Sequence, residues 1–530
     1  MTALLLHPPA AKAGEPPLGP AVLQSHLKAR RFEVAVFDAN RDAYRYLLRS
    51  DILAAAVDGD LSARLSRALR HVDASLSLLC SPAGVANPAR YATAVRFLND
   101  ALSLHGGGSG TERLTLGDYR HGQLSEFSLA DLEGLAAGHK RTLFHDYYRN
   151  ELLPALEKYR PHLLALSVNY RHQVLPSFEL AGLLRRRFPS ATLVAGGGMI
   201  GSWKDALQGG LRLPVFDHLV AGPGERPLCD LLERSPVSDY LMSDASSVAL
   251  SPDFEGLDPS GYLSPYPVLP VSASRGCYWA RCLFCPEAAS PTHPYKAFTG
   301  HTLPRLLLDL ADRWEVRHFH LTDNAVPPAA LRAMADQAEA LRHLCWYGFV
   351  RFEPSLLQGD LIERLARGGC RLLQLGLESG SQAVLDRLAK GTRLDVAAEV
   401  LQRLKRAGIA TYVYVLLGTP GETPEEAHQT KAFLEKHATC IDYLNLAIMN
   451  MPRHSALVAT DATDATDMVS PLDLYLPMDE DATERRAARR FLQRELLASP
   501  AIRTIVNRTP PLFTSNHAFF FGRVPQLKKL

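Results

Sequence analysis

The sequence predicts an α/β protein built on two parallel sheets, and three observations carry that prediction. Short apolar runs of strand length alternate with segments of helical periodicity in two stretches, residues 1–235 and 268–450. Several of these runs end at glycine or at a polar residue, as the carboxyl ends of parallel strands often do. The chain has 530 residues, which is more than one hydrophobic core usually holds. We therefore expect two α/β domains and a smaller third unit.

The first domain, residues 1–235, is predicted to be a Rossmann-like, doubly wound parallel sheet. Its expected strands are residues 3–6, 32–37, 163–169, 192–195 and 218–221, with helices at about 22–31 and 176–188. Residues 41–158 between the second and third strands have helical periodicity and few strand signals. We interpret them as a helical insertion.

Residues 236–267 are rich in Ser, Asp and Pro and have no lasting periodicity, which predicts a linker. Residues 268–450 then form the second domain. Its expected strands are residues 268–272, 318–322, 346–351, 372–377, 411–417 and 444–449, with helical patterns between them. Six such strand–helix units predict a partial (β/α)6 barrel, whose chemistry would lie at the carboxyl ends of the strands.

Residues 451–530 are predicted to be a small α-rich extension that caps the active site. A charged helix is expected at about 481–497. The tail at 513–521 is apolar and aromatic around one amide and one imidazole, that of His517. A single histidine among aromatic residues more often packs than reacts, but His517 is the candidate catalytic residue of this segment.

The composition describes a soluble globular protein, with 47% hydrophobic and 22% charged residues and a formal net charge of +2. That balance does not favour a nucleic-acid partner. The first apolar run is too short for a signal peptide, and no membrane span is expected. Scattered cysteines outside one loop suit a reducing compartment, so we expect a cytoplasmic protein.

That loop carries three thiols within nine residues, Cys277, Cys282 and Cys285, directly after Gly276. Three thiolates can hold an iron–sulfur cluster and leave one iron open to a ligand. A closed zinc site needs a fourth ligand, for which His293 is the nearest candidate. A third alternative is that the cysteines are core residues, and spacing alone favours the cluster only modestly.

The sequence Arg-Gly-Cys at 275–277, the aromatic linker and Phe284 before the last cysteine resemble the cluster loop of radical S-adenosylmethionine (SAM) enzymes. The resemblance implies a 4Fe-4S cluster on the three cysteines. In that family the open iron binds the amino and carboxylate groups of SAM, and an electron from the cluster cleaves SAM to a radical. The commonest spacing has three residues between the first two cysteines, whereas this chain has four.

A second match is longer. The run Gly376–Ser381, then Lys390-Gly391 and Gly418–Glu422, resembles the core shared by methylthiotransferases and cobalamin-dependent radical SAM enzymes. It implies that Phe284 lies near the adenine of SAM, Glu378 and Ser379 near its ribose or amino group, Arg351 near its carboxylate, and the turn at Gly418 near the adenine. The alternatives are loop packing for Phe284, a structural salt bridge for Arg351 and an ordinary turn at Gly418.

The order of features in residues 1–235 resembles the cobalamin-binding domain of cobalamin-dependent radical SAM enzymes. The features are a Pro-Pro loop after the first strand, a strand ending at Asp38, Ser167 closing a strand, and two glycine-rich turns. The resemblance implies a groove for the nucleotide tail of cobalamin lined by Ser167, Gly196, Gly197, Gly198, Gly222 and Gly224. The motif Asp-x-His-x-x-Gly, which supplies a histidine to cobalt in other cobalamin proteins, is absent.

The family implies an enzyme with three cofactors, a 4Fe-4S cluster, SAM and cobalamin. Its function would be C-methylation of an unactivated carbon in a natural-product, peptide or tetrapyrrole-type substrate, with a donor such as flavodoxin or ferredoxin supplying electrons. The first alternative is a cyclase or rearrangement enzyme without net methyl transfer. Methylthiotransferases carry a second cluster on three N-terminal cysteines. Here only Cys80 and Cys229 precede the cluster loop, so this function is disfavoured. A zinc-bearing scaffold protein is the alternative from a different class.

Overall fold

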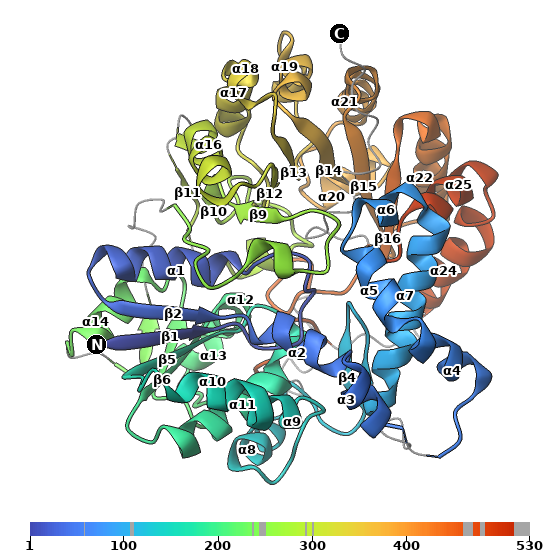
Figure 1. Ribbon diagram of the computed structural model, residues 1–530. Helices are drawn as coiled ribbons and strands as arrows, with labels where there is room; N and C mark the ends of the chain where they lie inside the picture. The colour runs from blue at the N-terminus through green and yellow to red at the C-terminus, as the bar shows by residue number, and fades with distance from the viewer. Residues whose placement is uncertain are drawn as a thin grey trace. The chain divides into compact units, whose positions relative to one another are not determined.

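The computed structural model describes residues 1–57, 59–106, 111–235, 238–242, 251–291, 294–298, 302–458, 470–476 and 483–512. These residues divide into two compact units. Unit 1 comprises Met1–Pro270 and Ser470–Leu472, and unit 2 comprises the other described residues from Val271 onward. Figure 1 labels their helices and strands. No helix in the described ranges has both the length and the hydropathy that crossing a bilayer requires.

Unit 1 contains a six-stranded sheet in the order β2-β1-β5-β6-β7-β8, in which all neighbours are parallel. The strands are β1 (Thr2–Leu6), β2 (Glu33–Phe37), β5 (Leu163–Ser167), β6 (Thr192–Gly196), β7 (His218–Ala221) and β8 (Tyr240–Met242). Helix α1 (Leu18–Ala29) lies on one side of the sheet and α11 (Val174–Arg187) on the other (Figure 1). The predicted doubly wound sheet is confirmed.

The direction of strand order reverses between β1 and β5. Open parallel sheets bind ligands in the crevice outside the carboxyl ends of the strands at such a switch point. Strand β1 is buried along its whole length, and β5 along all but its last residue, Ser167. Continuous apolar strands are expected where helices cover both faces of a sheet. Ser167, the polar last residue of β5, therefore falls at the edge where a ligand would bind.

The insertion between β2 and β5 is mainly helical, as predicted. Its helices are α2 (Ala39–Leu47), α3 (Ser50–Ala55), α4 (Ala63–Arg70), α5 (Val72–Leu79), α6 (Pro82–Ala86), α7 (Pro88–Leu102), α8 (Leu129–Ala137), α9 (His145–Tyr147) and α10 (Leu153–Glu157). It also contains an antiparallel hairpin of β3 (Glu112–Leu114) and β4 (Tyr119–His121). Strands of three residues are too short to show an alternating pattern, so this hairpin has no periodic signal in the sequence.

The structure differs from the predicted linker at 236–267. Strand β8 lies in this stretch and extends the sheet of unit 1. Farther along, Phe254, Leu257 and Tyr262 are buried, and the Tyr262 hydroxyl donates a hydrogen bond of 2.7 Å to the buried Asp38 after β2. The part that contains Phe254, Leu257 and Tyr262 has no periodicity, because single buried side chains anchor it to the fold. It is therefore a part of unit 1.

The second sheet has the order β16-β15-β14-β13-β12-β9, so its strands follow one another in chain order. They are β9 (Val268–Val271), β12 (His318–Leu321), β13 (Cys345–Val350), β14 (Cys370–Glu378), β15 (Ala410–Leu417) and β16 (Tyr443–Ile448). The helices between them are α16 (Thr302–Trp314), α17 (Pro328–Asp336), α18 (Ala338–Leu341), α19 (Leu361–Arg367), α20 (Gln382–Arg387), α21 (Leu394–Ala407) and α22 (Pro424–Lys436). The neighbours from β12 to β16 are parallel. All six predicted strands are present.

Helix α21 illustrates how the sequence pattern forms these elements. Its buried residues Ala397, Val400, Leu401 and Leu404 recur at the spacing of one helical face. The helix ends at Gly408, whose φ of 74° is the left-handed conformation that glycine adopts most readily.

The described part of the C-terminal extension contains α24 (Thr483–Phe491), a π-helical turn (Leu492–Leu496) and α25 (Pro500–Arg508). The Arg485 Nη1 donates a 2.7 Å hydrogen bond to the carbonyl of Met449, just beyond β16. A β-carbon built at Gly418, directly after β15, would lie 3.0 Å from the Cβ of Ala488. Helix α24 therefore packs at the carboxyl ends of β15 and β16.

Candidate functional site

The three closely spaced cysteines lie on the loop between β10 (Ser274–Arg275) and α15 (Pro286–Ala289). All three are free thiols, Cys282 being buried and Cys277 and Cys285 half-buried. The loop turns at Gly276, with a φ of 69°, and at Ala280, with a φ of 46°. These left-handed residues reverse the chain so that the thiols can share one site.

Positive charges flank the buried thiol. Burial raises the pKa of Cys282, while the nearby charges of Lys390 and Arg351 act to lower it. Cations beside a thiol favour the thiolate, which is the form that binds metal. The charged forms of Cys282 and Cys277 also contribute to the raised pKa of Cys285, so the three sulfurs lie within electrostatic range of one another.

This donor set fits an iron–sulfur cluster. Clusters take thiolate ligands, and these three come from one loop with cations beside them. Among the described residues, no group of three or more His, Cys, Asp or Glu side chains forms a site for one metal ion. His293 and His517, considered above as a zinc ligand and a catalytic residue, lie outside the described residues.

Asp323, directly after β12, fixes the entry to the loop. Its Oδ2 accepts a 2.9 Å hydrogen bond from the amide of Ala273, and its Oδ1 accepts one of 2.5 Å from the Ser274 hydroxyl. Burial raises the pKa of Asp323 to about 6. This carboxylate therefore holds the segment that leads into Cys277.

A buried ion pair lies at the end of β14. Lys390 Nζ is 2.7 Å from Glu378 Oε1, and both side chains are at least nine-tenths buried. Glu378 has a φ of 65°, a strained conformation for a residue with a side chain. A β-carbon at Gly376 would lie 2.6 Å from Lys390 Nζ and 2.5 Å from Glu378 Oε1, so only glycine leaves room for the pair.

Arg351, predicted to bind the carboxylate of SAM, makes several contacts inside unit 2. Its Nε donates to Glu353 Oε1 at 3.1 Å, its Nη1 to Cys282 Sγ at 3.7 Å, and its Nη2 to the carbonyl of Lys390. Its guanidinium also lies 4.2 Å from the ring centre of Trp279. The structural salt bridge considered from the sequence is present, and the side chain touches the cluster loop directly.

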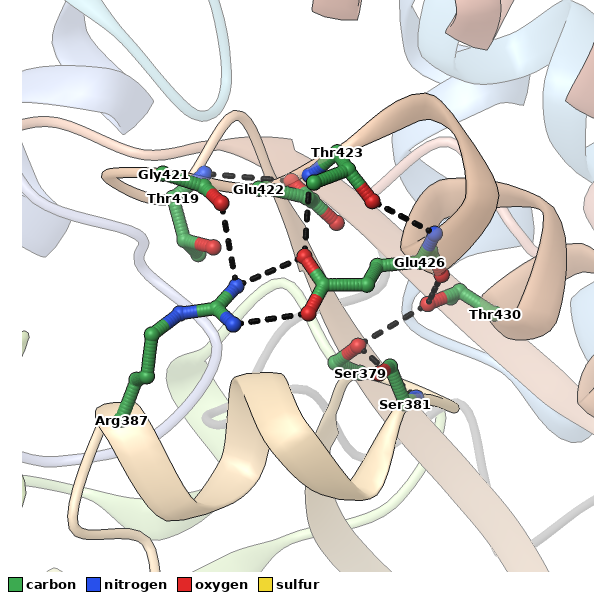
Figure 2. A network of polar contacts seen from close by, with 9 residues as sticks. All are labelled: Ser379, Ser381, Arg387, Thr419, Gly421, Glu422, Thr423, Glu426 and Thr430. Carbon is green, nitrogen blue, oxygen red and sulfur yellow. Dashed lines mark hydrogen bonds and ion pairs between the residues drawn. The ribbon is translucent and has the colours of Figure 1, made fainter.

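The loops after β14 and β15 are joined by the polar network in Figure 2. The hydroxyl of Ser379, a residue predicted to contact SAM, exchanges a 2.9 Å hydrogen bond with Thr430 and accepts one of 3.1 Å from the amide of Ser381. Arg387 binds both carboxylate oxygens of Glu426 at 2.7 Å. In this arrangement Ser379 ties its loop to α22.

The turn after β15 is closed by Glu422, whose Oε2 accepts hydrogen bonds from the amides of Gly418, at 2.7 Å, and Thr419, at 3.2 Å. Gly418 has a φ of 69°, which favours glycine. Phe284 is half-buried, with Lys390 Nζ 5.4 Å from its ring centre. Glu378 ends β14 and Gly418 follows the adjacent β15, and Phe284 lies near Lys390, the partner of Glu378.

The Arg387–Glu426 pair gives the site a defined acid sensitivity. Arg387 and the capping contacts of Thr423 lower the pKa of Glu426 from 4.5 to about 2. Because the folded-state pKa is the lower one, the pair stabilises the protein fully above pH 4.5, and this contribution is lost as the pH falls toward 2. We expect the loss of unfolding free energy caused by Arg387→Gln to shrink over that range. Urea unfolding at a series of pH values measures this loss, and Arg393→Gln, which removes one member of an exposed ion pair, is the control. A loss caused by Arg387→Gln that does not change with pH would contradict the lowered pKa of Glu426.

In unit 1, the predicted cobalamin residues follow three adjacent strands, β5, β6 and β7. The Ser167 hydroxyl accepts a 3.0 Å hydrogen bond from Asn169 Nδ2. Gly197 has a φ of 104°, and a β-carbon there would lie 2.5 Å from the carbonyl oxygen of Val168. Gly196 ends β6, Gly198 is exposed at the start of α12 (Gly198–Ser202), Gly222 has a φ of 91°, and Gly224 precedes α14 (Glu225–Leu232). These residues therefore share one edge of the sheet, and Gly197 is required by the fold itself.

Two side chains that the sequence analysis missed follow β1 at the same edge. His7 is buried, and burial lowers its pKa although Asp38 opposes the change. Lys12 is partly buried, and burial lowers its pKa to about 8. The sequence signal that could have identified Lys12 is the Pro-rich loop on which it lies.

Part of the chain matches a known protein family. Residues 271–434 match the family model described as "Radical SAM superfamily". An uncharacterized methyltransferase of Pyrococcus horikoshii is 24% identical over 184 residues, which are 34% of this chain and 38% of that protein. A threonylcarbamoyladenosine tRNA methylthiotransferase, MtaB, of Bacillus subtilis is 35% identical over 89 residues, 16% of this chain and 20% of its own. This chain thus matches well under half the length of either relative.

Solved structures resemble the chain over nearly its whole length. TsrM from Kitasatospora setae, a radical SAM methyltransferase solved with cobalamin and a [4Fe-4S] cluster, gives a TM-score of 0.55 at 15% identity and covers 93% of this chain and 86% of its own. OxsB, a cobalamin-dependent SAM radical enzyme solved with aqua-cobalamin, gives a TM-score of 0.53 at 15% identity and covers 95% of this chain and 58% of its own. At this identity the likeness concerns the fold.

Residues 271–434 form a radical SAM domain, the domain that the cysteine loop predicts. The chain as a whole has the fold of TsrM and OxsB, so the predicted fold is confirmed.

Proposed function

We propose that the protein is a cobalamin-dependent radical SAM methyltransferase that acts on an unactivated carbon of a small-molecule or peptide substrate. One observation carries the proposal. A radical SAM domain with three free thiols on one loop shares its chain with a parallel sheet whose glycine-rich edge lies at a switch point. When bound, the cluster supplies an electron to SAM, and cobalamin carries the methyl group.

In unit 2, Cys277, Cys282 and Cys285 would hold the cluster. Phe284 would pack against the adenine of SAM, while Glu378 and Gly418, at the ends of adjacent strands, would bind its ribose or amino group and its adenine. Buried Lys390 fixes the Glu378 carboxylate, and Glu422 fixes the Gly418 turn, so these groups are held rigidly before SAM arrives. Arg351, which contacts Cys282, would bind the carboxylate of SAM beside the cluster.

In unit 1, the nucleotide tail of cobalamin would lie along the edge formed by Ser167, Gly196, Gly198, Gly222 and Gly224. Support comes from the exposure of Gly198 and from the open space beside it, since a β-carbon there would approach no atom closer than 3.6 Å. Close approach of backbone to ligand is the usual reason for glycine at such an edge.

We expect Gly198→Val to lower the amount of bound cobalamin at least tenfold and to leave the iron content unchanged. The valine side chain would occupy the proposed cobalamin groove in unit 1, whereas the cluster cysteines belong to unit 2. Corrin absorbance after reconstitution with hydroxocobalamin and gel filtration measures the effect. Gly209→Val is the matched control, since Gly209 has an ordinary φ of −69° and ends α13 (Lys204–Gln208). Gly197 is unsuitable for this test because any β-carbon there collides with Val168. Full corrin retention by Gly198→Val would contradict the groove.

The reaction itself is tested by mass spectrometry of small molecules and peptides from cells with and without the gene. Methyl transfer predicts a product heavier than its precursor by one methylene, with the methyl group labelled by methyl-deuterated SAM. A gene-dependent product without that mass increase would replace the methyltransferase with a cyclase or rearrangement enzyme. A reductant such as flavodoxin or ferredoxin would supply the electrons.

A further inference from the structure

The linker between the first two cysteines is one residue longer than is common in the family, and its indole ring is held on two sides. The Trp279 Nε1 donates a 3.1 Å hydrogen bond to the carbonyl of Ala389. One ring face meets the Arg351 guanidinium at 4.2 Å, and Arg281 lies 5.2 Å from the same ring centre. Arginine stacks readily on aromatic faces, so this contact orients the guanidinium plane.

The segment Leu388–Gly391, after α20, supports both the loop and the arginine. Three successive carbonyls accept hydrogen bonds: Leu388 from the amide of Leu283 at 3.0 Å, Ala389 from Trp279, and Lys390 from Arg351 Nη2. Left-handed conformations at Ala389, with a φ of 50°, and at Gly391, with a φ of 68°, shape this segment.

Gly391 is the position where the ring is packed most closely. A β-carbon there would lie 2.1 Å from Cζ2 of Trp279, a distance at which something must move. The indole is the group that would have to move, and moving it would change its contact with Arg351.

A second linker side chain reaches the same arginine. The Tyr278 hydroxyl donates a 2.7 Å hydrogen bond to Glu353 Oε1, which also accepts from Arg351 Nε at 3.1 Å. The guanidinium thus held donates from Nη1 to Cys282 Sγ at 3.7 Å. The lengthened linker therefore brings two aromatic side chains to the arginine that contacts a cluster ligand.

We propose that Trp279 is a positioning residue. It packs against both Gly391 and Arg351, holds the guanidinium against the sulfur of Cys282 and so raises the reduction potential of the cluster. Positive charge and N–H···S hydrogen bonds at a ligand sulfur stabilise the reduced, more negative cluster. The inference rests on the proposed function, because it requires a cluster on Cys282.

The test is a reductive titration of the reconstituted protein without SAM, followed by electron paramagnetic resonance. We expect Trp279→Leu and Gly391→Ala each to hold wild-type iron and sulfide. At a fixed potential we expect the ratio of reduced to oxidised cluster in both variants to be about tenfold lower than in wild type, which corresponds to a reduction potential about 59 mV lower for a one-electron couple. Trp279→Phe keeps a stacking face and should retain most of the wild-type potential. Gly359→Ala is the matched control, since Gly359 has a φ of 54° and no atom within 4 Å of an added β-carbon.

A wild-type potential in both Trp279→Leu and Gly391→Ala would overturn the inference and leave the cluster assignment intact. Loss of iron from Trp279→Leu but not from Gly359→Ala would also overturn it, because the residue would then be needed for the cluster to bind. Wild-type protein without iron or sulfide would refute the proposed function instead.

Discussion

Replacing Cys282 by alanine is expected to remove nearly all of the bound iron and to abolish reductive cleavage of SAM. Three thiolates leave no spare ligand on the loop, and Cys282 is the buried one, with two cations beside it. Iron and acid-labile sulfide per chain, measured after anaerobic reconstitution, give the result. The same loss is expected for Cys277→Ala and Cys285→Ala.

The matched control is Cys440→Ser, which removes another free thiol of unit 2, in the turn before β16. It should leave the iron content unchanged. If Cys282→Ala retained full iron and cleaved SAM as wild type does, the three-cysteine site would be refuted.

Replacing Lys390 by methionine is expected to destabilise unit 2 by about 3–5 kcal/mol, because it leaves the buried carboxylate of Glu378 without its partner. Removing one member of a buried ion pair costs more than removing an exposed pair, since water cannot solvate the charge that remains. The midpoint of urea unfolding, followed by circular dichroism on cofactor-free protein, measures the loss.

The exposed pair Arg393–Asp395, three residues farther along, is the internal comparison, and Arg393→Met should destabilise the protein far less than Lys390→Met does. The double variant Lys390→Met/Glu378→Gln should recover much of the stability lost in the single variant, because no unpaired charge is then buried. A Lys390→Met variant as stable as Arg393→Met would show that the pair is not buried in solution.

The fold was largely predictable where strands are long and apolar. The runs at 372–377 and 411–417 lie inside β14 and β15, because buried parallel strands are continuous apolar stretches that sequence alone reveals. The segment with Phe254 and Tyr262 has the sequence pattern of a linker, because the buried side chains that anchor it are isolated and form no periodic pattern. The cysteine loop was visible because its spacing is local.

The surroundings of the cluster loop were not predictable, because they are made by residues distant in sequence. Trp279 meets Ala389 across 110 positions, and Arg351 meets Cys282 across 69. Nothing local marks Gly391 as the position that holds an indole ring, or Ser379 as the partner of Thr430. Such partners follow from tertiary packing, which a single sequence does not encode locally.

The most direct test of the account is elemental analysis of the protein produced without oxygen in cells supplied with hydroxocobalamin and then purified anaerobically. A cobalamin-dependent radical SAM enzyme should contain about four iron atoms per chain, with about one cobalt and little zinc. Protein that contains zinc and neither iron nor cobalt would contradict the account.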